Sequence, residues 1–251
     1  MSTATGRVAF ITGAGHGIGR ATAQRLAREG YRVAVNDLKA EFVDETLALI
    51  QAEGGQALGI VQNIASREGM QAALDQLMAQ TGQLDVMVNN AAWVRYPPLA
   101  EITPEVVERM LGVGFSSVIW GMQAAADLMR DHSGCSIVNV ASVAGLRSPR
   151  HSVVYSGIKA GVMGMTRAAA AELGARGIRV NAVAPGAVPT EGTLKHRSAE
   201  RDAMRVARTP LGRLGTVQDV ADAIAWLAGE DSRFLSAEIL TIDGGMSRTS
   251  L

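Results

Sequence analysis

Short apolar runs rich in β-branched residues alternate along the chain with longer segments in which apolar residues recur at helical spacing. The runs predict strands at 8–12, 32–37, 57–62, 84–90, 136–142, 178–185 and 238–243. The longer segments predict helices at 18–29, 40–53, 66–81, 104–131, 154–175 and 216–229. Strands that alternate with helices in this way favour an α/β fold, with helices on both faces of a parallel sheet.

No linker, internal repeat or low-complexity tract interrupts the alternation, so we predict a single domain over residues 1–251. One stretch, 187–209, follows neither pattern and is too long for a simple connection. Long loops in compact domains are often lids or binding segments. We therefore expect a substrate lid at about 187–209.

The composition excludes several classes of protein. Lys+Arg and Asp+Glu both number 24, so no net charge favours nucleic acid or a membrane surface. The single Cys135 excludes an internal disulfide framework. No apolar stretch approaches the roughly 20 residues of a membrane span, and the N-terminus shows no signal peptide. We expect a cytoplasmic protein without a metal site that binds neither nucleic acid nor membrane.

The first motif is "TGAGHGIG", which follows the first predicted strand and opens the first helix. Gly13, Gly17 and Gly19 allow a tight turn and a close approach of the backbone to a pyrophosphate, and the helix N-terminus supplies N–H groups for that anion. Asp37 ends the second predicted strand, 18 residues after Gly19. A carboxylate there can accept hydrogen bonds from an adenosine ribose. The alternative is a helix cap or a surface acid.

The second constellation is Tyr155 and Lys159, which lie on one helix face, with Ser142 at the end of a predicted strand. A free tyrosine has a pKa of about 10 and is a poor base at neutral pH. A cation about 4 Å away would lower the pKa by roughly 3 units before desolvation raises it again. The phenol would then be a usable general acid/base near pH 7. Alone, such a pair is more often an exposed helix face.

Together these motifs resemble those of the short-chain dehydrogenase/reductase family. The resemblance covers nearly the whole chain and rests on "TGAGHGIG", "VND", "NNAA", "IVNVASVAG", "YSGIK", "IRVNAVAPGAVPT" and "TIDGG". It implies a Rossmann-like, doubly wound sheet of seven parallel strands. It also implies a nicotinamide cofactor and a homotetramer, for which the helix with Gly157, Gly161 and Gly164 offers a face of small residues.

The resemblance also assigns roles to residues. Tyr155 would be the proton donor and acceptor, Ser142 would polarise the substrate oxygen, and Lys159 would hold the ribose and lower the tyrosine pKa. The cofactor contacts that it implies are Gly13, His16, Gly17, Ile18, Gly19, Asp37, Leu38, Asn63, Ile64, Asn90, Ala91, Tyr155, Lys159, Pro185, Gly186, Val188 and Thr190.

The acid at the second strand favours NAD(H) over NADP(H). Asp37 would repel a 2′-phosphate, and Leu38 after it supplies no cation. Lys39 and His16 are the only nearby bases and could weaken the preference.

The sequence departs from the family pattern at three positions. Asn63 replaces an Asp near the adenine, and Ala92 replaces the last glycine of "NNAG". Gly114 replaces an Asn that stabilises a break in the fourth helix, where a freed carbonyl holds a water linked to the lysine. We expect Gly112 and Gly114 to permit the same break through backbone freedom. The alternative is a damaged relay and a slow or inactive protein.

Charged residues near the expected substrate region suggest a polar substrate: a sugar, polyol or hydroxy acid. Arg147, Arg150 and His151 precede Tyr155, and the predicted lid holds Lys195, His196 and Arg197. Trp93, Arg95 and Tyr96 follow the "NNAA" turn and, by family analogy, face the same region. From these we select Trp93, Arg95, Arg150 and His151 as substrate contacts. The alternative is a solvated charged surface.

Three functions remain open on the sequence. The first is an NAD-dependent dehydrogenase or ketone reductase acting on a secondary alcohol. The second is an enzyme that uses the same residues on another bond, in imine reduction or epimerisation. The third is a dinucleotide-binding sensor with weak chemistry, which the intact Ser–Tyr–Lys set disfavours.

Overall fold

The computed structural model describes residues 6–129, 134–192 and 198–249. Its centre is one sheet of seven parallel strands in the order β3-β2-β1-β4-β5-β6-β7. The strands are β1 (Val8–Thr12), β2 (Arg32–Asp37), β3 (Gln56–Val61), β4 (Val86–Asn89), β5 (Ser136–Val140), β6 (Arg179–Pro185) and β7 (Ile239–Ile242).

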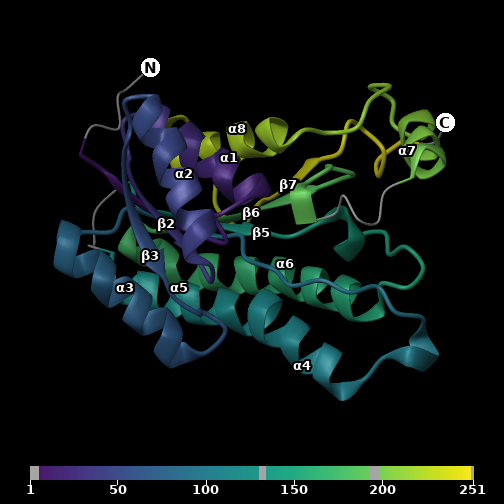
Figure 1. Cartoon of the computed structure of the whole chain (residues 1–251), viewed down its shortest axis with the longest axis horizontal. Helices are drawn as coiled ribbons and strands as arrows, with labels where there is room; N and C mark the ends of the chain where they lie inside the picture. Colours follow the sequence, from purple (N-terminus) through teal and green to yellow (C-terminus); the bar gives the residue numbers. More distant parts are fainter. Residues whose placement is uncertain (1–5, 130–133, 193–197, 250–251) are drawn as a thin grey trace.

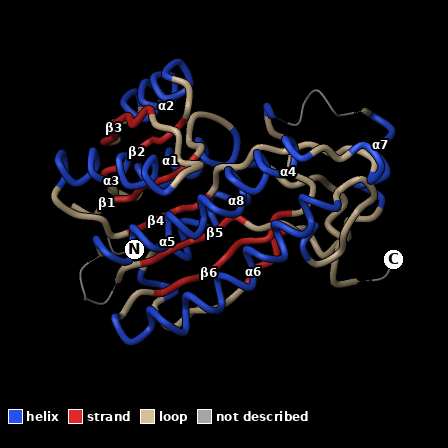
Figure 2. Tube along the Cα trace, turned by 90° about the horizontal axis from the view of Figure 1, so that it is seen from below, coloured by secondary structure: helices blue, strands red, loops and turns tan. Residues whose placement is uncertain are grey.

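Helices cover both faces of the sheet (Figure 1). Helices α1, α2 and α8 lie on one face, and α3, α5 and α6 lie on the other. The helices are α1 (Gly17–Arg28), α2 (Ala40–Ala52), α3 (Arg67–Thr81), α4 (Pro104–Leu111), α5 (Ser117–Leu128), α6 (Val153–Leu173), α7 (Ala199–Ala207) and α8 (Val217–Ala228). Helix α7 lies beyond the sheet, at one end of the molecule (Figures 1 and 2).

The apolar runs become strands because the central strands are covered on both faces. Strands β1, β4, β5 and β6 are buried along their whole length. Parallel strands of this kind are expected to be continuously hydrophobic. Their carboxyl ends meet at one edge of the sheet, and the chain reverses its winding direction between β1 and β4. Ligands of open α/β sheets bind at such a switch point.

The predicted fold class is confirmed, and the predicted strand boundaries lie within two residues of the observed ones. Two predictions of helices need correction. The expected helix 104–131 is divided into α4 and α5, and the stretch 187–209, expected to be irregular, contains α7. The sequence analysis did not predict α7. The signal that was available is Ser198, whose hydroxyl caps the helix by accepting a hydrogen bond from the Arg201 N–H.

The helix break expected near Gly112 and Gly114 is confirmed as a π-helical segment, Gly112–Ser116, between α4 and α5. Single π-turns within α-helices displace the regular hydrogen bonds and are common at functional sites. The buried Ser117 hydroxyl donates to the Val113 carbonyl at 2.6 Å, so a serine satisfies an acceptor at this break. The expected water near Lys159 stays a prediction.

The glycines around this break differ in what surrounds them. A Cβ on Gly121 would lie 2.1 Å from Asn89 Oδ1, so the helix could not approach β4 as closely with any other residue. A Cβ on Gly114 would lie 3.4 Å from Ile158 Cγ2, which is ordinary contact. Close packing therefore requires glycine at 121, whereas position 114 has room for a side chain.

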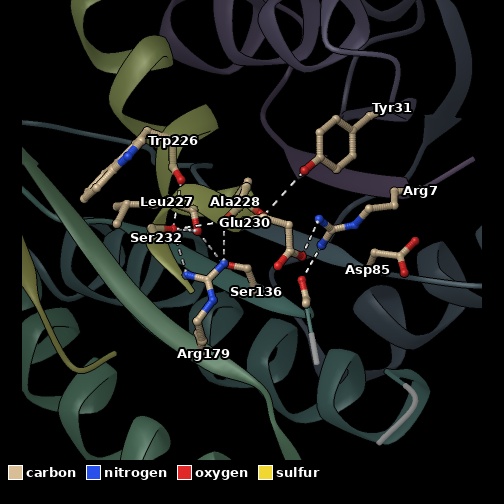
Figure 3. Close-up of polar contacts among 12 residues, drawn as sticks. Arg7, Tyr31, Asp85, Ser136, Arg179, Trp226, Leu227, Ala228, Glu230 and Ser232 are labelled. Carbon is tan, nitrogen blue, oxygen red and sulfur yellow. Dashed lines mark hydrogen bonds and ion pairs between the residues drawn. The ribbon is translucent and has the colours of Figure 1, made fainter. Parts of the chain in front are cut away.

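Side chains from the sheet hold the C-terminal end of α8 at the amino edge of the strands (Figure 3). The Ser136 hydroxyl donates to the Leu227 carbonyl at 2.9 Å, and the buried Arg179 guanidinium donates to the Gly229 carbonyl at 3.1 Å. The last carbonyls of a helix have no partner within it, and a cation there also interacts favourably with the helix dipole. This network fixes the amino edge and leaves the carboxyl edge for the site.

Within the described part of the chain, none of the helices is long and apolar enough to cross a membrane.

We predict opposite effects for two alanine substitutions in this region. Gly121→Ala should destabilise the protein by about 1–3 kcal/mol, because the new methyl overlaps Asn89 in the packed core. Gly114→Ala should be neutral or stabilising by up to about 1 kcal/mol, because it fits and reduces the entropy of the unfolded chain. Urea denaturation of both variants measures the difference. Equal destabilisation by the two would contradict the packing described for Asn89 and Ile158.

Candidate active site

The glycine-rich turn after β1 has the backbone that only glycine adopts easily. Gly13 and Gly17 have φ angles of 62° and 58°, in the left-handed region. A Cβ on Gly19 would lie 2.2 Å from the Gly13 carbonyl oxygen. His16 precedes α1 without capping it by its side chain, so the first N–H groups of the helix stay available for an anion.

The end of β4 packs directly against this turn. The Asn90 side chain donates to the carbonyl oxygens of Thr12 and Gly13 at 2.8 and 3.1 Å. The Thr12 hydroxyl accepts hydrogen bonds from the backbone N–H groups of Asn90 and Ala91 at 2.9 and 3.0 Å. The motifs "TGAGHGIG" and "NNAA", far apart in the sequence, thus form one rigid unit, in which Thr12 has a part that the sequence reasoning did not assign.

Asp37 lies at the carboxyl end of β2 and is oriented by backbone donors. Its two carboxylate oxygens accept hydrogen bonds from the N–H groups of Gly15, at 3.1 Å, and Leu38, at 2.8 Å. A Cβ on Gly15 would lie 2.7 Å from the same carboxylate, so glycine is needed there as well. Sequence reasoning missed Gly15, although it lies within the glycine-rich motif.

The cations near Asp37 have other partners. Arg20 donates to the Gly15 carbonyl and forms an ion pair with Glu45 at 2.7 Å. Lys39 lies 4.9 Å from the centre of the Phe42 ring and 3.7 Å from the Glu41 carboxylate. The His16 ring packs edge-on against the same Phe42. None of the ion pairs described for these side chains therefore involves Asp37.

The other predicted cofactor residues lie at the same edge of the sheet. Asn63 and the buried Ile64 follow β3, and the Asn63 side chain accepts from the Ala65 N–H at 3.0 Å. Gly186 follows β6 and donates to the Ile242 carbonyl at 2.9 Å. Val188 packs against the core on the α1 side, and Thr190 lies 3.4 Å from where a Cβ on Gly17 would stand.

Ser142, Tyr155 and Lys159 come together beside this edge. Lys159 is 4% exposed and its ammonium donates to the Val140 carbonyl at 2.6 Å, at the end of β5. The same nitrogen lies 5.8 Å from the centre of the Tyr155 ring. Ser142 follows β5, and its hydroxyl accepts from the Ala144 N–H at 3.1 Å. The i, i+4 spacing on α6 thus places the side chains of Tyr155 and Lys159 near each other, beside the end of β5.

Burial dominates the electrostatics of this cluster. Desolvation lowers the pKa of Lys159 to about 8. Desolvation also raises the pKa of Tyr155, and a hydrogen bond with Ser142 opposes this in part. Desolvation of the phenol therefore outweighs the lowering of the Tyr155 pKa that was expected from Lys159, whose ammonium donates to Val140. Tyr155 is a neutral phenol near pH 7.

The predicted substrate residues fall into two groups. Trp93 lies between the guanidinium groups of Arg95 and Arg109, which are 4.7 and 4.3 Å from its ring centre. Tyr96, close to them in the chain, packs its ring edge-on against Tyr155 at 5.5 Å. This group borders Tyr155 through Tyr96.

The second group lines a cavity of about 460 Å³ between the loop before α6 and helix α7. Arg150 and His151 line it from the loop, Arg201 and Arg205 line it from α7, and Arg208 lines it from the C-cap of that helix. The α7 arginines were missed, although their spacing of four and three residues could have indicated one helical face. Trp93 and Arg95 are not among the lining residues, and Lys195, His196 and Arg197 lie outside the described residues.

The residues present fit a dinucleotide. The cradle at Gly13 and Gly19 is too narrow for a side chain, helix α1 presents its N-terminus to it, and Asp37 stands at the end of β2. These are the features by which parallel sheets hold a pyrophosphate and a ribose.

We predict that Lys159 makes stability depend on pH. Its folded-state pKa of about 8 lies below the ordinary 10.5, so the unfolded chain binds more protons between these values and stability rises with pH across that window. Relative to Lys159→Met, the wild-type free energy of unfolding should rise by up to about 3 kcal/mol from pH 8 to pH 10.5. Urea denaturation across this range measures it, with Lys39→Met as the exposed control. A pH-independent difference between wild type and Lys159→Met would contradict the burial cost.

Comparison with known proteins extends the resemblance over the whole fold. A family model described as enoyl-(acyl carrier protein) reductase matches residues 13–247. Cis-4-hydroxycyclohexanecarboxylate dehydrogenase of Sinomonas cyclohexanicum is 38% identical over 242 residues, which cover 95% of this chain and 96% of that protein.

Two solved structures carry bound nicotinamide cofactors. A 7α-hydroxysteroid dehydrogenase with NADH and 7-oxo glycochenodeoxycholic acid has a TM-score of 0.92 at 32% identity, covering 96% of this chain and 94% of that one. Gluconate 5-dehydrogenase of Burkholderia cenocepacia J2315, with NADP and tartrate, has a TM-score of 0.92 at 31% identity, covering 98% and 97%. A match of this extent and identity, on the same sheet topology, shows that the chain belongs to the short-chain dehydrogenase/reductase family.

Proposed function

We propose that the protein is an NAD(H)-dependent oxidoreductase that interconverts a secondary alcohol and a ketone, with a polar substrate such as a sugar, polyol or hydroxy acid. The observation that carries this proposal is the convergence of Ser142, Tyr155 and Lys159 at the end of β5, beside the glycine cradle. Relatives named as dehydrogenases of hydroxy acids and a hydroxysteroid support the reaction class.

The cofactor would lie along the carboxyl edge of the sheet. The turn at Gly13 would hold the pyrophosphate, Asp37 the adenosine ribose, and Lys159 the second ribose through ammonium protons that Val140 does not use. The segment Pro185–Thr190 would hold the nicotinamide, and Asn63 and Asn90 would border the adenine and the central part of the site. When bound, the nicotinamide accepts or supplies the two electrons and one hydrogen exchanged at the carbinol carbon.

The protein supplies the proton chemistry. Because burial raises its pKa, Tyr155 is protonated near pH 7 and can donate its phenolic proton to a ketone oxygen in reduction. In oxidation Tyr155 would react as the phenolate: it first gives up its own proton to solvent, and the phenolate oxygen then accepts the proton of the substrate hydroxyl. Ser142 would hydrogen-bond the substrate oxygen, and the Lys159 cation would stabilise the phenolate when it forms.

A screen of NAD reduction over secondary alcohols, polyols, sugars and hydroxy acids tests the proposal. We expect turnover with at least one polar alcohol and a ketone as its product. Turnover without a ketone product would favour chemistry on another bond, and binding of NAD without any turnover would favour a sensor.

On an active substrate, Tyr155→Phe should reduce kcat by about 10²–10⁴, the usual contribution of a positioned acid/base. NAD binding, measured by protein fluorescence, should remain. Tyr31→Phe is the matched control, because it removes a phenolic hydroxyl at the amino edge of the sheet. A Tyr155→Phe variant with near-normal kcat would remove this residue from the mechanism.

The ratio of kcat/KM for NAD to that for NADP should favour NAD in the wild type and fall in Asp37→Ser. Repulsion of about 1.4 kcal/mol between the carboxylate and a 2′-phosphate is enough for a ten-fold preference. Asp44→Ser, which removes an exposed acid on α2, should leave the ratio unchanged. An NADP preference in the wild type would show that Lys39 and His16 outweigh Asp37.

We further propose a homotetramer. Gly157 and Gly164 on α6 have open space where a Cβ would stand, and Phe234 is fully exposed, which suits contact with other copies of the chain. Light scattering that finds a monomer at micromolar concentration would contradict this.

A further inference from the structure

The cavity between α7 and the loop before α6 has a strongly positive lining. Arg150, Arg201, Arg205 and Arg208 all border it, and no carboxylate is among its described lining residues. Arg150 and Arg208 form no ion pair with any residue in the ranges that the structure describes, and Arg205 lies 3.6 Å from Asp202. Arg150 and Arg208, which have no such acid among the described residues, border the same concave space and repel one another, and a bound anion relieves that repulsion.

The loop wall of this cavity is fixed to the catalytic helix. Ser152 donates to the Pro149 carbonyl, and its hydroxyl also lies 2.8 Å from that of Ser156 in the first turn of α6. His151, which lies between Pro149 and Ser152 in the chain, has a φ of 60°, which is uncommon for a residue other than glycine. Strained backbone of this kind tends to occur at ligand sites.

Tyr96 connects the cavity to the reacting groups. Its ring packs against Tyr155, and its surroundings include Arg205 from the cavity wall. Tyr96 thus lies against Tyr155, is about half exposed, and is near enough to Arg205 for the charge of that cation to act on its hydroxyl. The side chains of Met204 and Met246 form an apolar part of the lining of the same cavity.

We propose that this cavity binds an anionic group of the substrate, a carboxylate or phosphate separated from the carbinol carbon by a short carbon chain, which Arg150 and Arg208 hold from opposite walls. The inference rests on the proposed function, because it places the reacting carbon at Tyr155. Arginine forms paired, charge-assisted hydrogen bonds with both carboxylate and phosphate. The methionines would contact the carbon chain between the two ends.

Binding is tested first, without any turnover. Isothermal titration calorimetry with inorganic phosphate and with succinate, on the full chain with and without NAD, should detect both anions. The double variant Arg150→Gln/Arg208→Gln should weaken binding at least about ten-fold, because it removes one charged partner from each wall. Arg233→Gln, which changes an exposed arginine outside the cavity, should bind as the wild type does.

Turnover is tested with two pairs of alcohols, in each of which one member carries an anionic group and the other is neutral. Glycerol 3-phosphate is compared with glycerol, and 3-hydroxybutanoate with butane-1,3-diol, so the two pairs distinguish phosphate from carboxylate. At least one anionic member should have a KM about ten-fold or more below that of its neutral partner. Raising NaCl from about 50 to about 500 mM should increase the KM of that member, since salt screens exposed charges. The double variant should remove most of the KM difference, with a smaller effect on kcat.

The outcomes separate this inference from the proposed function. If no alcohol is oxidised but the anions bind and the double variant loses them, the proposed reaction fails and the anion site stands. If alcohols are oxidised but the KM values are equal within both pairs, the inference is overturned while the reaction stands. The same holds if alcohols are oxidised and the wild type binds neither anion. Equal weakening by Arg233→Gln would also overturn it, because the effect would then be one of net charge.

Discussion

The close approach of the turn after β1 to the end of β4 is the constraint on which the site depends. Asn90 and Thr12 hydrogen-bond across this contact, and Gly13 and Gly19 leave no space for a side chain within it. The same contact fixes the carboxyl edge of the sheet, where Asp37 and the Ser142–Tyr155–Lys159 cluster lie. A parallel sheet brings these distant segments together because the carboxyl ends of its strands share one edge.

Burial then sets the chemistry of the cluster. Lys159 is almost fully buried and donates to a strand carbonyl, at a cost in stability that a purely structural residue would avoid. The π-helical segment Gly112–Ser116 also packs against α6, the helix that carries Lys159. Gly114 lacks the amide found elsewhere in the family, and the Ser117 hydroxyl satisfies a carbonyl of the π-helical segment. The break is thus present here without that amide.

Much of this was predictable because it follows from local pattern. Strand runs, the glycine turn and the i, i+4 pair on α6 each have a period or spacing that the fold must respect. What was not predictable depends on tertiary surroundings. The direction of the Tyr155 pKa shift follows from desolvation by packed neighbours, and the cavity of Arg150 and Arg208 requires α7 to face a loop nearly fifty residues earlier in the chain. Sequence spacing also did not explain why residue 121 is a glycine. The reason is tertiary, because a Cβ there would overlap the Asn89 side chain across the core.

The most direct test of the account follows one hydrogen atom. An active alcohol carrying deuterium at its carbinol carbon is oxidised in ordinary water, and the reduced cofactor is examined by mass spectrometry. We expect the deuterium to be recovered in the reduced cofactor, because the proposed reaction moves that atom directly from carbon while Tyr155 exchanges only the hydroxyl proton. Deuterium lost to water, or retained in the product, would contradict the proposed dehydrogenase chemistry.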